Sequence, residues 1–190
     1  MKIRTGFVSN SSSSSFIVYG QSKWNENAER NLKAYIHRFI DGHVFRYNPQ
    51  EDFGWNFRVY YDWMSKFDWA FLQMYYHLYE PEHTYYYETM LEFLRLYYPE
   101  IERIETKRFQ LEQYPDFEDE DYYVEDEPSG YIDHESIGGE NAEILEDVDT
   151  LRNFILCDDS FICNQNDNSD WYWKIVDGVP TKTQYNGMWD

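Results

Sequence analysis

Two consecutive stretches in the middle of the chain place large apolar side chains at helical spacing, and a proline stops each of them. The first covers residues 62–79 and ends before Pro81, and the second covers residues 84–98 and ends before Pro99. The side chains that share a face are Trp63, Phe67, Phe71, Met74 or Tyr75, and Leu78 in the first stretch, and Tyr87, Leu91, Leu94 and Tyr98 in the second. Because proline cannot continue a helix, both stretches are predicted to be helices that form an antiparallel hairpin.

Most of these apolar side chains are rings, and this is true of the whole chain. Aromatic residues are 21% of the 190 residues, so the core of the protein is expected to be built largely from rings. A highly charged chain often indicates disorder, but disordered chains are poor in aromatic residues. The length suits one ordinary domain, and we expect residues 1–190 to fold as a single acidic, aromatic-rich domain.

Two more helices are predicted, one on each side of the hairpin. In residues 22–40 the apolar positions recur at helical spacing, and Gly42 stands where a C-terminal cap belongs. In residues 141–156, Ile144, Val148, Leu151 and Ile155 share one face.

The two ends of the chain are predicted to form strands. Phe16–Tyr19 has the make-up of a strand, and the serine tract before it, residues 9–15, is expected to be a loop between two strands. Near the other end, Phe161–Cys163 and Trp171–Val176 are further strands, and Asp177-Gly178 is a hairpin turn signal. The predicted fold class is α+β, with central helices packed on a small antiparallel sheet formed by the N-terminal and C-terminal strands.

The charge of the chain is concentrated in one region. No lysine or arginine lies between Arg108 and Arg152, and this region contains 16 acidic residues, so it carries −16 of the formal net charge of −20. Its first part, residues 112–130, combines an acidic run with Pro115 and Pro128. We expect this part to be a loop, and we call it the acidic loop.

The total charge is large enough for nucleic-acid mimicry. A compact chain of this length has a radius of gyration of about 16 Å and so a diameter on the order of 40 Å. Duplex DNA of about that length carries roughly 24 phosphate charges. The net charge of −20 is of the same order. Direct binding to nucleic acid is disfavoured by charge repulsion, so the expected partner is a basic surface of another protein.

The residues expected to contact such a partner are the acids of the acidic loop and two rings among them. They are Asp116, Glu118, Asp119, Glu120, Asp121, Tyr122, Tyr123, Glu125, Asp126 and Glu127. Rings supply much of the affinity of an interface, while carboxylates speed encounter and set specificity. The alternative is that the rings fold back onto the core and the acids form a solvated face.

The opening of the chain carries the one resemblance in the sequence. Residues 4–17 read Arg-Thr-Gly-Phe-Val-Ser-Asn, then five serines, then Phe-Ile. This resembles an N-terminal signature of uncharacterised proteins of bacteriophages and of Gram-positive bacteria that carry prophages. The segments Tyr131–Ser136 and Asp158–Ile162 are also similar to segments of some of those proteins. The resemblance implies a phage origin and no particular activity. The leading hypothesis is therefore a phage-derived inhibitor of a host or defence protein that handles nucleic acid.

An enzyme or ligand-binding domain is the alternative hypothesis. Successive backbone N–H groups of a serine loop at Ser11, Ser12, Ser13 and Ser14 would bind a phosphate, although the glycine spacing and lysine of a P-loop are missing. Asp133, His134 and Asp158 would bind a divalent cation if their loops converge. The sequence contains none of the local motifs of the common hydrolases or dinucleotide-binding enzymes, which favours a binding protein without a cofactor.

Other features concern the place where the protein acts. No apolar run reaches the length that spans a bilayer, and the first residues do not resemble a signal peptide, so we expect a cytoplasmic protein in a bacterial host cell with no membrane partner. Cys157 and Cys163 are expected to be reduced, partly buried thiols. A virion or assembly component and self-association both stay open.

Overall fold

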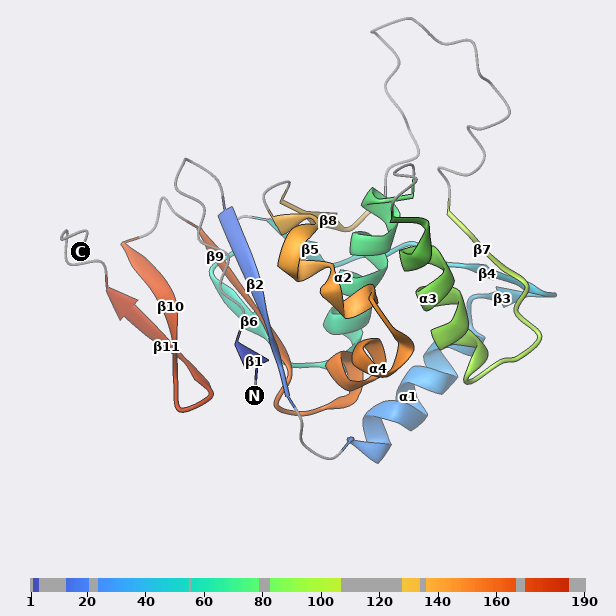
Figure 1. The fold of residues 1–190 in the computed structure, drawn as a ribbon, viewed down its shortest axis with the longest axis horizontal. Helices are drawn as coiled ribbons and strands as arrows, with labels where there is room; N and C mark the ends of the chain where they lie inside the picture. The colour runs from blue at the N-terminus through green and yellow to red at the C-terminus, as the bar shows by residue number, and fades with distance from the viewer. Residues whose placement is uncertain are drawn as a thin grey trace, which may run out of the picture.

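The computed structural model of the chain describes residues 2–3, 13–20, 24–54, 56–78, 83–106, 128–133, 136–166 and 170–184. Within these residues, helices from the middle of the chain pack on a sheet that joins its two ends (Figure 1). The predicted α+β fold class is confirmed. No helix among the described residues is long and apolar enough to cross a membrane.

In the described part of the chain, the main sheet has four antiparallel strands in the order β1-β2-β9-β6. Their bounds are Lys2–Ile3 for β1, Ser13–Tyr19 for β2, Arg58–Tyr60 for β6 and Phe161–Asn166 for β9. The ladder between β2 and β9 pairs Ser13 with Asn166 at one end and Val18 with Phe161 at the other. Strands from the two ends of the chain therefore lie side by side, as predicted, and β6 adds an edge strand from the middle of the chain.

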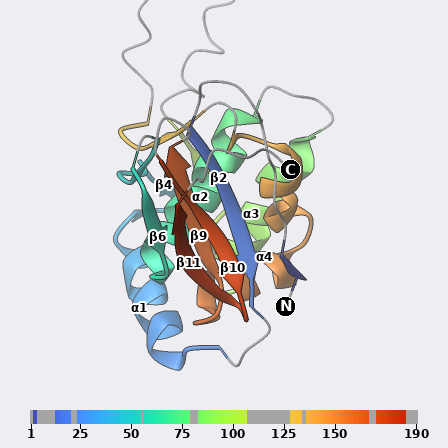
Figure 2. The same ribbon diagram turned by 90° about the vertical axis from the view of Figure 1, so that its left-hand side faces the viewer.

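A β-hairpin covers the outer face of this sheet. Strands β10 (Trp171–Val176) and β11 (Val179–Gln184) pair in register around Asp177 and Gly178, which both have positive φ. Asp and Gly tolerate this conformation, so the predicted turn is confirmed. Trp173 and Ile175 of the hairpin pack on Val18, Phe161 and Cys163 of the sheet. Figure 2 shows the hairpin in front of the sheet, with the helices behind it.

Among the described residues, four α-helices form the other layer, and side-chain caps define where three of them begin. The helices are α1 (Glu26–His37), α2 (Trp63–Tyr76), α3 (Thr84–Arg95) and α4 (Val148–Leu156). Asn25, Asp62 and Asp147 accept hydrogen bonds from backbone N–H groups in the first turns of α1, α2 and α4. Each cap satisfies donors that have no partner inside the helix.

Helix α2 lies at the centre of the molecule. Every side chain from Ser65 to Tyr75 is buried, and α2 packs against α1, α3 and α4. Rings fill the core around it, including Phe45, Phe53, Trp69 and Phe93, none of which is exposed to solvent. Rings are a large part of this core, beside many Ile and Leu side chains, and α2 and α3 pack together as expected.

Short strands that the sequence did not predict build a frame around one end of α2. Strands β3 (Ile40–Asp41), β4 (Val44–Arg46) and β7 (Arg103–Glu105) form a three-stranded sheet in which β4 and β7 are parallel. Strands β5 (Asp52–Phe53) and β8 (Tyr131–Ile132) form a second, parallel pair. These pairings bring residues 40–53 next to residues 103–106 and 128–132.

Several predicted boundaries are wrong. Strand β2 begins at Ser13, so the last three residues of the serine tract are strand and not loop, because β9 continues to pair with them. The helix predicted over 141–156 begins only at Val148, where Asp147 caps it. Short 3-10 turns at Gly139–Asn141 and Glu143–Leu145 precede it. The predicted helix over 22–40 is shorter as well, from Glu26 to His37.

Candidate functional site

A pocket with a volume of about 520 Å3 lies beside the end of α1 and the paired strands β4 and β7. The residues that line it are Tyr35, Arg38, Phe39, Arg46, Tyr47, Asn48, Gln50, Glu105 and Thr106. Pockets that hold small organic ligands have volumes of about 300–1,000 Å3, so the size is suitable. We call this candidate site the Arg38 pocket.

Three rings form the apolar wall of the Arg38 pocket. The centroid of the Phe39 ring lies 5.0 Å from that of Tyr35 and 4.8 Å from that of Tyr47, and both pairs are edge-to-face. This geometry is favoured because the positive edge of one ring meets the negative face of the other. Tyr47 is buried, while Tyr35 and Phe39 are half-buried. The wall is therefore fixed at Tyr47 and reaches solvent at the other two rings.

A chain of hydrogen bonds runs from this wall to a buried carboxylate of α2. The hydroxyl groups of Tyr35 and Tyr47 lie 3.0 Å apart, and the Tyr47 hydroxyl donates to Oδ1 of Asp68. The other oxygen of Asp68, Oδ2, accepts from the backbone N–H groups of Gln50 and Glu51, each at 3.0 Å. Since Tyr47 has one proton and gives it to Asp68, Tyr35 must donate to Tyr47. The Tyr35 oxygen then keeps its remaining acceptor capacity for a donor from outside.

Burial shifts the pKa of each side chain in this series of hydrogen bonds. It raises the pKa of the Asp68 carboxyl, and the hydrogen bonds from Tyr47 and from the backbone partly oppose this effect. Burial raises the pKa of Tyr47 above its ordinary value, and the negative charge of Asp68 raises it further. The pKa of Tyr35 is also raised by burial. Both phenols therefore keep their protons at neutral pH and act as hydrogen-bonding groups rather than as bases.

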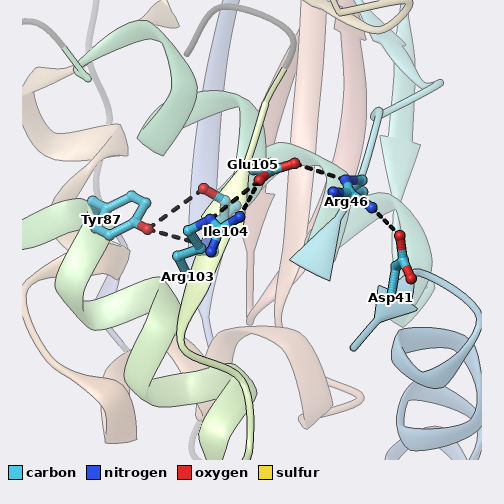
Figure 3. A network of polar contacts seen from close by, with 6 residues as sticks. All are labelled: Asp41, Arg46, Tyr87, Arg103, Ile104 and Glu105. Carbon is cyan, nitrogen blue, oxygen red and sulfur yellow. Dashed lines mark hydrogen bonds and ion pairs between the residues drawn. The ribbon is translucent and has the colours of Figure 1, made fainter. Parts of the chain in front are cut away.

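A network of charged side chains forms one side of the pocket (Figure 3). Arg46 on β4 binds Asp41, and its Nε lies 2.7 Å from Oε2 of Glu105 on β7. The other oxygen of Glu105 accepts from NH2 of Arg103 at 2.6 Å. Hydrogen bonds from these two guanidinium groups lower the pKa of the Glu105 carboxyl, and the bond from Arg103 has the larger effect. Glu105 is therefore held as a carboxylate that joins the two parallel strands.

Arg38 differs from these arginines because it has no carboxylate partner among the described residues. Its guanidinium carbon lies 5.7 Å from the centroid of the Tyr35 ring and 5.9 Å from that of the Phe39 ring. Cations over aromatic faces are attracted by the ring quadrupole, so these rings orient the side chain. Arg38 is exposed, and its hydrogen-bond donors are available to a ligand in the pocket.

Both ends of the segment that contains the acidic loop meet the described part of the chain beside the Arg38 pocket. Thr106 follows β7 directly, and Pro128 lies with it along a small cleft next to Tyr47 and Asn48. Asn48 fixes the returning chain, since its side-chain amide donates to Oγ of Ser129 at 2.9 Å and accepts from the backbone N–H of Ser129 at 3.0 Å.

Gly130 makes this close approach possible. Its backbone N–H donates to the Pro49 carbonyl at 2.7 Å. A Cβ atom at this position would lie 2.7 Å from the Glu51 carbonyl oxygen, closer than real Cβ atoms approach. Only glycine allows the two backbones to lie so near each other. The strand pair β5 and β8 continues from this point.

The residues predicted to contact a partner lie outside the described part of the chain. They are Asp116, Glu118, Asp119, Glu120, Asp121, Tyr122, Tyr123, Glu125, Asp126 and Glu127. Of the serines predicted to bind phosphate, Ser11 and Ser12 are also outside it, and Ser13 and Ser14 belong to β2. Because successive N–H groups of a strand point in opposite directions, these two serines do not form a concave anion site.

The residues predicted to bind a metal ion have different surroundings. Asp133 is buried next to the end of β8, and His134 lies outside the described residues. Asp158 is exposed in the turn after α4, where its Oδ1 accepts from Nδ2 of Asn25 at 2.9 Å. Among the described residues, no group of three or more His, Cys, Asp or Glu side chains could hold a metal ion. Cys157 and Cys163 are both buried free thiols.

The sequence did not point to the Arg38 pocket, because its residues come from three separate segments that only the short strands bring together. The one local signal is Tyr35-x-x-Arg38-Phe39 at the end of α1, where an arginine and two rings stand close together. No protein-family model, no curated protein and no solved structure matches this chain.

Proposed function

We propose that this protein binds a basic surface of a host or defence protein that handles nucleic acid, and inhibits it by occupying that surface. The observation that carries the proposal is the concentration of charge: residues 109–151 contain 16 acids and no lysine or arginine. Thr106, just before this region, and Pro128, inside it, line one cleft. The resemblance of the first residues to phage proteins supports a phage origin.

The physical argument concerns both the rate and the specificity of association. A patch of one charge sign speeds encounter with a patch of the opposite sign and disfavours partners of like charge. A surface that binds nucleic acid is basic, and binding to it releases counterions. A protein with a net charge of −20 can therefore compete for such a surface without itself binding nucleic acid.

The test compares two proteins that have lost the same charge from different places. In the first, Glu118, Asp119, Glu120 and Asp121 are changed to Gln or Asn, and in the control the exposed residues Glu88, Glu92, Glu100 and Asp177 are changed in the same way. Asp177 occupies a turn with positive φ that asparagine tolerates, so the control is expected to fold. Wild type and both variants are tagged and used to capture proteins from nuclease-treated bacterial lysate, and the affinity for each captured protein is measured with purified components.

We expect a basic nucleic-acid-binding protein to be retained at about 0.05 M salt and released at about 0.5 M salt, because screening weakens exposed charge pairs. Changing the four loop acids is expected to weaken its binding at least about fourfold, since exposed pairs contribute roughly 0.2–1 kcal/mol each. The control is expected to change binding much less, and the captured protein should lose its own nucleic-acid binding when this protein is added. Equal weakening by both variants, or full activity of the captured protein in the complex, contradicts the proposal.

A further inference from the structure

The Arg38 pocket is a built site, because buried polar groups hold its wall in place. Asp68 is 4% exposed and takes hydrogen bonds from Tyr47 and from two backbone N–H groups. These bonds fix Tyr47 from beneath, and Tyr47 in turn holds Tyr35 through the contact between their hydroxyl groups. Satisfied buried networks of this kind make a local structure rigid. The rings therefore keep their positions when nothing is bound.

The charges around the pocket favour an anion at one point. Arg46 is paired with Asp41 and Glu105, and Arg103 with Glu105, whereas Arg38 has no ion pair among the described residues. The network holds Arg46 and Arg103, so Arg38 is the lining cation whose donors a ligand can reach. In a protein with a net charge of −20, an exposed arginine next to an apolar pocket is a specific place for a negatively charged group.

Two oxygen atoms of lining residues have hydrogen-bonding capacity left among the described residues. Thr106 is 5% exposed, and its hydroxyl has no hydrogen-bond partner among the described residues. A buried hydroxyl without a partner is unfavourable, so a ligand that reaches Thr106 would gain by binding to it. The Tyr35 oxygen accepts a further hydrogen bond, because its proton is given to Tyr47. A ligand that fits both would carry a donor on its ring as well as its anionic group.

We propose that the Arg38 pocket binds a small molecule that consists of a flat aromatic ring and an anionic group. The ring lies against Tyr35, Phe39 and Tyr47, where it meets further ring faces and edges, and the anionic group binds the guanidinium of Arg38. Nucleoside monophosphates and aromatic carboxylic acids share this chemistry, and a pocket of about 520 Å3 has room for either. This site goes beyond the proposed function, because it involves no macromolecular partner and no residue of the acidic loop.

The experiment uses two pairs of probes that differ in the anionic group. Adenosine monophosphate is compared with adenosine, and indole-3-acetate with indole, by calorimetric titration and by two-dimensional NMR on the full chain. At least one anionic probe is expected to bind with a dissociation constant below about 1 mM, at least tenfold more tightly than its neutral counterpart. Preference for one anionic probe over the other tells whether the natural ligand is a nucleotide or an aromatic acid.

Matched variants locate the binding. Arg38→Gln is expected to weaken the binding of the anionic probe at least tenfold and to leave the affinity for the neutral probe unchanged. Phe39→Leu is expected to weaken the binding of both probes. Arg30→Gln is the control, because Arg30 is an exposed arginine of the same helix that does not line the pocket. Arg38 has no ion pair among the described residues, so its replacement removes only the two contacts with the rings and is expected to lower the melting temperature by at most a few degrees.

Three results would overturn the proposal. One is that neither anionic probe binds below about 1 mM. Another is that a neutral probe binds as tightly as its anionic counterpart. The third is that Arg30→Gln weakens binding as much as Arg38→Gln, since the effect would then come from the general charge of the protein and not from the pocket.

Discussion

Replacing the buried lysine of α2 is expected to remove a pH dependence from the stability of the protein. Lys66 is 1% exposed, and its Nζ donates to the carbonyl oxygens of Cys157 at 2.8 Å and Ser160 at 3.2 Å. Burial disfavours the charged amine and lowers its pKa from 10.5 to about 8. Methionine is unbranched and similar in length, so Lys66→Met removes the titrating group with little change in volume.

The direction of this pH dependence follows from the number of protons that the folded and the unfolded protein bind. Between about pH 8 and pH 10.5 the unfolded chain still binds the proton of Lys66, whereas the folded protein has lost it. The free energy of unfolding therefore rises with pH in this window. A pKa shift of this size corresponds to about 3 kcal/mol, of which about 2 kcal/mol falls between about pH 7.5 and about pH 9.5. Burial raises the pKa of Cys163, which gives an opposite slope near the same pH.

The quantity to measure is the difference between wild type and Lys66→Met, because the Cys163 contribution is common to both. Urea denaturation followed by tryptophan fluorescence gives the free energy of unfolding at each pH. We expect the advantage of wild type over the variant to grow by about 2 kcal/mol from about pH 7.5 to about pH 9.5. Lys174→Met, which removes an exposed lysine, serves as the control and should show no such change. A constant difference between wild type and Lys66→Met would refute the reasoning, since Lys66 would then titrate alike in both states.

Three further substitutions test other parts of the structure by the same unfolding measurement. Tyr47→Phe is expected to destabilise by about 1–3 kcal/mol, because Asp68 loses a donor. The loss should become smaller as the pH falls and Asp68 is protonated, because the charged form of Asp68 needs the donor more. Gly130→Ala is expected to destabilise the protein by about 1–3 kcal/mol, since the new Cβ would lie 2.7 Å from a backbone oxygen. A smaller effect would show that the two backbone segments at this point can move apart. Asp147→Ala removes the cap of α4, in which Asp147 accepts from the backbone N–H and the hydroxyl of Thr150. The expected loss of about 1 kcal/mol should disappear in acid, because those bonds lower the pKa of Asp147 and its stabilisation is lost as the carboxylate becomes protonated.

The elements that the sequence predicted well are those whose signals are local. The spacing of rings in residues 62–79 and 84–98 marks α2 and α3, because a helix that packs on a core needs apolar groups every three or four residues. Asp177-Gly178 marks the hairpin, because few residue pairs tolerate its backbone conformation. In both cases a few neighbouring residues determine the structure.

The frame around the candidate site could not be predicted in this way. Strands β3, β4, β5, β7 and β8 contain two or three residues each, which is too short for an alternating pattern. They exist because distant segments pair, as Arg46 does with Glu105 across β4 and β7. Ser13 shows the same effect, because its partner Asn166 makes it part of a strand. The Arg38 pocket is formed by these pairings, and so it was missed together with them.

Three buried polar side chains of α2 explain how a protein with so many short strands keeps one structure. Irregular segments leave backbone groups without regular partners, and such groups need hydrogen bonds when they are buried. Lys66 donates hydrogen bonds to backbone carbonyls of the turn after α4, and Asp68 accepts hydrogen bonds from the backbone N–H groups of residues 50 and 51. Gln73 donates to the carbonyl of Ser136 at 2.7 Å and accepts from the N–H of Gly138 at 2.9 Å.

These three side chains therefore hold separate loops against one helix, and a substitution at any of them is expected to loosen its own loop more than the helix itself. The bonds of Asp68 support the residues of both proposed sites. They hold Tyr47, at the wall of the Arg38 pocket, and Glu51, whose carbonyl accepts from the N–H of Tyr131 at the start of β8. One buried carboxylate thus supports both the proposed ligand site and the point where the acidic loop rejoins the fold.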